Sequence, residues 1–115
     1  MIELNLPYPP TANHIWIRAR KGMRKSDEYE RWLRDAGFIA LAQKPGRLQG
    51  PYKLSIQIRR PDRRRRDLDN AIKPISDLLA SVGIIENDCL CEMLSARWVT
   101  NGEGVTVRIE PAGVE

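Results

Sequence analysis

Three short stretches of this chain alternate strictly between apolar and polar residues, and this alternation constrains the fold more than any other feature. They span residues 2–6, 52–58 and 105–109. A period of two places the apolar side chains on one face of a strand, so each stretch predicts a strand that buries one face. A fourth extended segment is expected from after residue 89 to about residue 99, ahead of the turn sequence NGEG.

Two helices are predicted between these strands. Ser26 is suited to an N-cap, and apolar residues recur at helical spacing over residues 27–43. A second helix is expected over residues 72–82, with Pro74 in its first turn and Gly83 at its end. The order β-α-β-α-β-β predicts an α+β fold in which two helices pack on a small mixed sheet.

The segment between the first strand and the first helix has a less regular pattern. Residues 13–25 are expected to be an irregular or strand-like stretch; they end in the basic sequence RARKGMRK and, with Gly22 in its middle, are expected to form an exposed loop. Trp16 is expected in the core, with stacking on an exposed base as the alternative. Cys89 and Cys91 are expected on one face of a strand as small buried side chains.

Positive charge is concentrated in two segments of the chain. Nineteen basic residues against 15 acidic residues give a net charge of +4, and six arginines lie within residues 59–66. Clustered arginines bind phosphate oxygens in a bidentate manner, so both segments are candidates for contact with a nucleic-acid backbone. The candidate DNA-binding residues are Arg63, Arg64, Arg65 and Arg66 in one segment and Arg18, Arg20, Lys21, Arg24 and Lys25 in the other.

Three aspartates follow the larger arginine cluster. Asp67 and Asp69 stand in D-x-D spacing, which in extended backbone brings two carboxylates onto one side, and Asp88 comes after the second helix. Oxygen ligands of this kind suit Mg²⁺ or Mn²⁺, which can polarise a phosphodiester and activate a water. Lys73 lies four residues past Asp69 and could neutralise charge on the reacting phosphate.

Other interpretations of these residues stay open on sequence alone. Asp69 and Asn70 are good N-caps, and Asp67 could pair with a neighbouring arginine. The alternative function is then a non-catalytic nucleic-acid-binding module whose aspartates cap a helix. A structural or protein-interaction domain is a third possibility, and it would need neither metal nor DNA.

Two stretches resemble a known family. The sequence PDRRRRDLDNAIKPISDLLASVGIIEND resembles the central motif of the RusA family of Holliday junction resolvases, endodeoxyribonucleases often encoded by prophages. The opening LPYPPTANHIW is similar to the family's Pro-rich start. The resemblance covers nearly the whole chain and implies one RusA-like endonuclease domain over residues 1–115.

The resemblance also implies roles for individual residues. Asp67, Asp69 and Asp88 would bind Mg²⁺, for which Mn²⁺ can substitute, and Lys73 matches the family's catalytically important lysine. Asn70 has a weaker claim to chemistry, and Glu86 is an outer candidate beside the site. The implied activity is resolution of four-way DNA junctions by paired symmetric nicks, carried out by a homodimer in DNA recombination and repair.

The sequence argues against several other classes of protein. No apolar run approaches the roughly 18 residues of a membrane span, and the N-terminus lacks the pattern of a secretory signal, so a cytoplasmic, nucleoid-associated protein is expected. His14 is the only histidine and is expected to be structural or exposed. It has no partner motif that would make a zinc site with the cysteines.

Overall fold

The alternating stretches pair into one four-stranded sheet in a computed structural model that describes residues 1–10 and 15–113. The strands lie in the order β1-β6-β4-β5; β4 pairs with β5 in parallel, whereas the pairs β1–β6 and β4–β6 are antiparallel. The predicted mixed sheet is confirmed. In chain order the elements are β1 (Ile2–Leu6), β2 (Trp16–Ala19), β3 (Gly22–Lys25), α1 (Asp27–Ala42), β4 (Tyr52–Arg59), η2 (Leu68–Ala71), α2 (Ile72–Ser81), η3 (Asp88–Leu90), β5 (Cys91–Val99) and β6 (Val105–Pro111).

One face of the sheet forms the core. Leu4, Val107 and Ile56 lie side by side across β1, β6 and β4, and each is completely buried. The polar residues between them are on the other face, where Arg108 donates to Glu3 at 2.9 Å. The alternation in the sequence therefore reports the two faces of the sheet directly.

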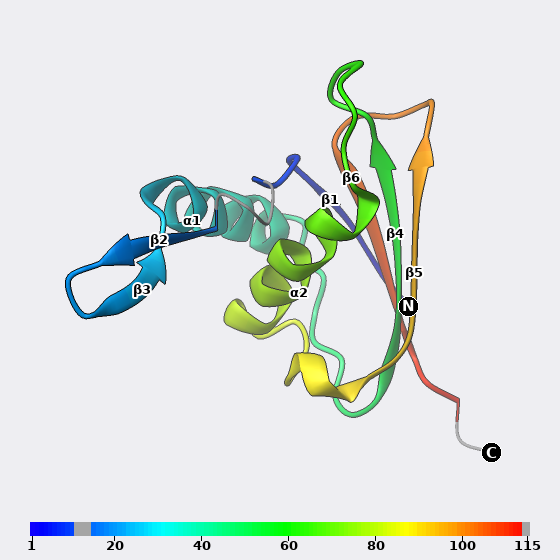
Figure 1. The fold of residues 1–115 in the computed structure, drawn as a ribbon. Coiled ribbons are helices and arrows are strands. Elements are labelled where there is room, and N and C mark those ends of the chain that lie inside the picture. The colour runs from blue at the N-terminus through cyan, green and yellow to red at the C-terminus, as the bar shows by residue number, and fades with distance from the viewer. Residues whose placement is uncertain (11–14, 114–115) are drawn as a thin grey trace.

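Both helices cover the apolar face of the sheet (Figure 1). The predicted cap of α1 is confirmed, because the Ser26 hydroxyl accepts a hydrogen bond from the backbone N–H of Tyr29 at 3.1 Å. Pro74 lies in the first turn of α2, and Gly83 follows the end of that helix with a φ of 77°. These features fix where α2 begins and ends, and so where the polar residues around its N-terminus lie.

The turn at 101–104 joins strands that are not neighbours. β5 and β6 lie on opposite sides of β4, so the chain crosses the end of β4 between them (Figure 1). The backbone N–H of Arg59, the last residue of β4, donates to the carbonyl of Gly104 at 3.0 Å. Gly104 has a φ of 62°, and a Cβ at this position would lie 2.4 Å from the Leu6 carbonyl oxygen. Glycine is required there by both conformation and space.

The basic segment before α1, expected as an exposed loop in an irregular or strand-like stretch, is a hairpin of two exposed strands. β2 and β3 pair in an antiparallel two-stranded sheet that extends away from the main sheet (Figure 1). Ile15 is buried (2% exposed) and Trp16 is 46% exposed, so the expectation that Trp16 belongs to the core is wrong. Successive residues of an extended chain face opposite sides, and Ile15 takes the inward side. The prediction for His14 concerns a residue outside the described ranges.

The prediction that the two cysteines lie on one face of a strand is also wrong. Cys89 lies in the short turn η3 and is exposed, whereas Cys91 is the first residue of β5 and is partly buried. The side chain of Asn87 accepts a hydrogen bond from the Cys89 backbone N–H at 2.9 Å, which favours a turn at this point over an extended strand. No described helix is long and apolar enough to cross a membrane.

Candidate active site

Asp67 and Asp69 lie where the chain enters α2. Asp67 has extended backbone (φ −84°, ψ 125°), whereas Asp69 is in the 3₁₀ turn η2, so the D-x-D is extended only at its first residue. Asp67 occupies the N-cap position of η2 without a capping hydrogen bond from its side chain. Among the described residues neither carboxylate forms a hydrogen bond or ion pair. Capping and arginine pairing therefore do not account for these side chains.

Both carboxylates line one hollow between η2 and β5, here called the carboxylate hollow. It is lined by Arg66, Asp67, Leu68, Asp69, Ile72, Leu94 and Ala96. The two aspartates are exposed, and unpaired carboxylate oxygens are the donors that Mg²⁺ and Mn²⁺ prefer. This donor pair fits part of a divalent-cation site.

Asp88 lies in a second hollow, the α2 hollow, on the flank of that helix. Its lining residues are Trp16, Lys25, Lys73, Asp77, Ala80, Ser81, Glu86, Asn87 and Asp88. The Lys73 ammonium is 3.5 Å from the Asp88 carboxylate. Within residues 1–10 and 15–113, no three His, Cys, Asp or Glu side chains are close enough to hold one metal ion. Asp88 is thus paired with Lys73 and is not gathered with Asp67 and Asp69.

Lys73 is held mainly by a residue that the sequence did not single out. Its ammonium lies 2.9 Å from the carboxylate of Asp77, one turn further along α2. The hydroxyl of Tyr29, a buried residue of α1, donates to the other oxygen of Asp77 at 2.5 Å. The hydrogen bond to Asp77 raises the pKa of Lys73, and the charge of Asp88 acts in the same direction. Lys73 is therefore a protonated, oriented cation at neutral pH.

The arginine cluster is divided between paired and exposed side chains. Arg66 forms a bidentate pair with Asp62, with nitrogen–oxygen distances of 3.1 and 2.7 Å, and its guanidinium lies over the ring of Tyr8. The hydrogen bond from Arg66 lowers the pKa of Asp62 to about 2. The backbone N–H of Arg64 also donates to Asp62. Asp62, and not Asp67, is the carboxylate that pairs with this cluster.

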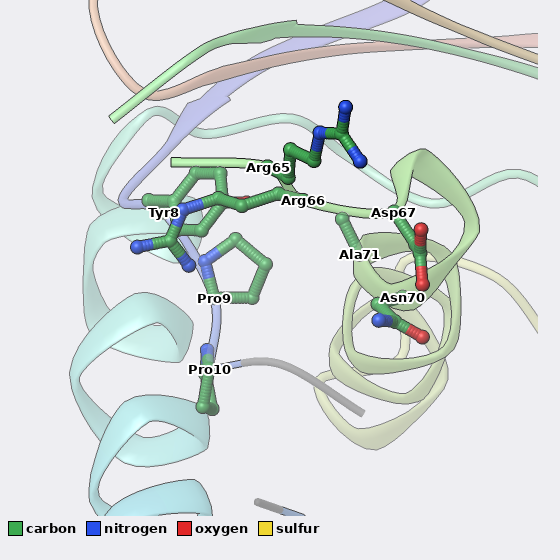
Figure 2. Close-up of a pocket in the computed structure, with 8 residues that line it drawn as sticks. All are labelled: Tyr8, Pro9, Pro10, Arg65, Arg66, Asp67, Asn70 and Ala71. Atoms are coloured by element: carbon green, nitrogen blue, oxygen red, sulfur yellow. The ribbon is translucent and has the colours of Figure 1, made fainter. Parts of the chain in front are cut away.

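Figure 2 shows a third hollow, the proline hollow, beside Arg66. Arg66 folds toward Tyr8, whereas Arg65 points away from it. The hollow lies between the Pro-rich segment and η2 and is lined by Tyr8, Pro9, Pro10, Arg65, Arg66, Asp67, Asn70 and Ala71. Asp67 lines both this hollow and the carboxylate hollow. The Pro-rich opening of the chain thus lies beside the candidate metal ligands.

The basic residues of the hairpin are in different environments. Arg24 pairs with Asp27 at 3.2 Å, and the Lys25 ammonium lies 5.9 Å from the centre of the Tyr29 ring. Arg18, Arg20 and Lys21 are exposed near the tip of the hairpin. Only Lys25 of this group reaches the α2 hollow.

Comparison with known proteins identifies the family. Residues 7–110 match the family Endodeoxyribonuclease RusA, and this span includes every candidate site residue named above. The chain belongs to the RusA family. It is 33% identical over 84 residues to a crossover junction endodeoxyribonuclease of Enterobacteria phage HK97, covering 72% of this chain and 70% of that protein.

Two bacterial RusA proteins give similar results. The crossover junction endodeoxyribonuclease RusA of Escherichia coli is 37% identical over 87 residues, covering 75% of this chain and 72% of that protein. The Aquifex aeolicus protein of the same name is 38% identical over 64 residues, covering 52% of this chain and 51% of its own length. Because the chain belongs to a family of endonucleases, it is an enzyme of that class.

Sequence reasoning missed the residues that hold this RusA-family site in place. Asp77 follows Lys73 by four residues and Asp62 precedes Arg66 by four, and the first spacing is a recognisable helical pair. Tyr29 is 48 residues from Asp77, so no local pattern could have linked them. Glu86, expected beside the site, accepts a hydrogen bond from the Gly50 backbone N–H at 2.6 Å and also borders the α2 hollow.

Proposed function

We propose that this RusA-family protein is a Mg²⁺-dependent, structure-selective endodeoxyribonuclease that resolves Holliday junctions. It acts as a homodimer, makes paired symmetric nicks, and serves DNA recombination and repair. The observation that carries the proposal is the pair of carboxylates, Asp67 and Asp69, which have no partner among the described residues. They precede an oriented lysine at the start of α2 in a chain of this family. The names of the relatives from the phage and from E. coli support the junction as substrate.

Asp67, Asp69 and Asp88 are the residues proposed to hold the cation. A Mg²⁺ ion held by them would polarise the phosphodiester and help to activate the attacking water. Among the residues that the structure describes, Asp67 and Asp69 have unpaired oxygen donors, whereas Asp88 must share its carboxylate with Lys73. The first two are therefore the core of the proposed site.

Lys73 is proposed to stabilise negative charge on the reacting phosphate. Its ammonium keeps its charge at neutral pH because Asp77 raises its pKa, and the Tyr29–Asp77 hydrogen bond restricts the position of Asp77. Preorganised cations of this kind lower the barrier because they need not reorient as charge develops. Arg63 and Arg65, which are exposed, are proposed to contact the DNA backbone and position it.

A homodimer suits the proposed substrate. A two-fold enzyme can present two identical sites to two strands of like polarity and cut them symmetrically. Sedimentation velocity of the purified protein tests this part of the proposal. A single boundary at twice the mass of 13.2 kDa is expected. A protein that stays monomeric at the concentration where it cuts junctions in pairs would contradict it.

The activity is tested with a synthetic four-way junction and three proteins: wild type, Asp69→Asn and Asp35→Asn. Asp35 is an exposed carboxylate on α1 that contacts only Arg34 among the described residues, so it is a control for loss of charge. We expect wild type and Asp35→Asn to cut with Mg²⁺ and not with EDTA. Asp69→Asn should bind at least as well, because one carboxylate fewer repels phosphate, but should not cut.

The competing function predicts a different pattern. A non-catalytic DNA-binding module would bind the junction in a salt-sensitive way, and neither wild type nor variant would cut it with Mg²⁺ or Mn²⁺. That result would overturn the proposed activity. Absence of binding at low salt would overturn both interpretations.

A further inference from the structure

The α2 hollow contains an aromatic side chain that the proposed chemistry does not use. Trp16 lines this hollow together with Lys73 and Asp88, although it belongs to the hairpin and they belong to α2 and η3. The other two tryptophans are accounted for: Trp32 is 8% exposed, and Trp98 lies beneath the Arg60 guanidinium at 4.5 Å. Trp16 is 46% exposed, with no aromatic or cationic partner among the described residues.

The base of the hairpin is fixed, so the position of Trp16 is fixed with it. Ile15 is buried in the core, and its carbonyl accepts a 2.7 Å hydrogen bond from the backbone N–H of Ser26, the cap of α1. Trp16 pairs with Lys25 in the hairpin register, and both line the hollow. An inward Ile15 places the next side chain outward, toward the hollow.

The charges around the hollow indicate what can occupy it. Three carboxylates, from Asp77, Glu86 and Asp88, face two ammonium groups, from Lys25 and Lys73. Lys73 is already paired with Asp77 and Asp88. Beyond the reacting phosphate proposed to lie at Lys73, the hollow therefore offers little positive charge for a second phosphate, whereas a neutral planar ring can stack on the indole and use the polar rim for hydrogen bonds.

We propose that the α2 hollow binds one unstacked base of the DNA substrate, with Trp16 stacking on it. The inference rests on the proposed function, because that function brings a DNA strand to Lys73 and Asp88. A base taken into this hollow would anchor the strand next to the reacting phosphate, and every base has a face on which an indole can stack.

The test compares Trp16→Ala, Trp16→Phe and the control Met23→Ala. Met23 is an apolar side chain on the other strand of the same hairpin, 62% exposed, and it does not line the hollow. Binding of a labelled junction and a labelled single strand is measured by anisotropy with EDTA present. Indole fluorescence is followed in a parallel titration with unlabelled DNA.

Loss of one base–aromatic stack should weaken binding by Trp16→Ala about fivefold or more, since such stacks contribute on the order of 1–3 kcal/mol. Trp16→Phe should retain most of the affinity because its ring still stacks, and Met23→Ala should bind like wild type. DNA should quench wild-type indole fluorescence, and the quenching should be lost in Trp16→Phe. Circular dichroism of both Trp16 variants should match wild type because the side chain is half exposed.

Two results would overturn the base site. One is equal affinity of wild type and Trp16→Ala; the other is quenching in Trp16→Phe as large as in wild type, because Trp98 beside Arg60 accounts only for a residual signal. A wild-type protein that binds and is quenched but never cuts the junction would end the proposed nuclease function and leave the base site standing. A protein that binds no DNA would end both.

Discussion

The two fully buried tyrosines of this domain differ in what their hydroxyl groups contact. The Tyr29 hydroxyl donates to Asp77, whose other oxygen holds Lys73. The Tyr52 hydroxyl, on β4, has no hydrogen-bond partner among the described residues. A buried polar group without a partner costs stability, whereas one bonded to a carboxylate contributes to it. The hydroxyl of Tyr29 therefore stabilises the site, whereas the hydroxyl of Tyr52 lowers the stability of the fold.

Replacing each tyrosine with phenylalanine should separate these effects. We expect Tyr29→Phe to lower the free energy of unfolding by about 1.5 kcal/mol or more, because a hydrogen bond to a charged group is lost. Tyr52→Phe should be neutral or should raise the free energy of unfolding by about 1 kcal/mol. Urea denaturation of both variants measures the difference. A Tyr52→Phe protein that is less stable than Tyr29→Phe would contradict this account.

Tyr52 should also make the stability depend on pH in the alkaline range. Burial raises its pKa to about 12 from the usual value near 10. Because the folded state then holds the proton more tightly than the unfolded state, this contribution is complete below pH 10 and is lost as the pH rises toward 12. Thermal melts of wild type and Tyr52→Phe between pH 9 and 12 test this expectation. The wild type should lose more stability over that interval than the variant, and equal losses would show that Tyr52 does not titrate in this way.

Asp77 should affect catalysis without affecting binding. In Asp77→Asn the ammonium of Lys73 loses its closest charged partner and is free to move toward Asp88. A misplaced catalytic group can lower the rate by up to about a hundredfold. We expect the cleavage rate at saturating junction to fall while the dissociation constant changes little. Asp35→Asn is again the control, and a variant that cuts at the wild-type rate would remove Asp77 from the site.

At the scale of elements, the turn between β5 and β6 depends on a single glycine. A Cβ on residue 104 would collide with the Leu6 carbonyl oxygen, whereas Gly102, with a φ of 81°, has no atom within 4 Å of that position. Gly104→Ala should therefore lower the free energy of unfolding by about 1–3 kcal/mol more than Gly102→Ala does. Gly102→Ala is the control, because it changes only the backbone conformation and creates no collision. Chemical denaturation of both variants provides the comparison. Equal losses of stability in the two variants would mean that the backbone at residue 104 can move away from the Leu6 carbonyl without cost.

The elements also show which parts of the fold could be predicted. The strands β1, β4 and β6 and both helices follow from local periodicity, because each buries one face. The segment that forms the hairpin β2–β3 could be predicted only as irregular or strand-like, since its residues are basic and exposed on nearly all sides and alternation gives little signal. The strand order was not predicted either, because the placement of β6 between β1 and β4 depends on contacts between distant segments.

The site could be predicted only in part for the same reason. Asp67, Asp69 and Lys73 are close in sequence and lie at one end of α2, as expected. The expected group of three carboxylates is not assembled among the described residues, because Asp88 is paired with Lys73. Ion pairs of this kind are decided by which side chains the folded chain brings within reach.

At the scale of the whole molecule, the two basic segments lie on different sides of α2, one following β4 and the other in the hairpin (Figure 1). Within the first segment, Arg63 and Arg65 are exposed and unpaired among the described residues, whereas Arg66 is held by Asp62. The charge available to DNA is therefore smaller than the sequence suggests. The number of phosphate contacts that this charge makes can be measured from the salt dependence of DNA binding.

Each phosphate contact contributes about 0.9 to the slope of log K against log salt concentration for duplex DNA. The double substitution of Arg63 and Arg65 by glutamine should therefore reduce the slope by about 2 and weaken binding uniformly across sequences. Arg34→Gln is the matched control, because Arg34 is an exposed arginine of α1 beside Asp35 and belongs to neither segment. Anisotropy titrations at several salt concentrations give the slopes. If the double variant keeps the wild-type slope, the exposed arginines do not contact phosphate, and the hairpin becomes the principal electrostatic contact with DNA.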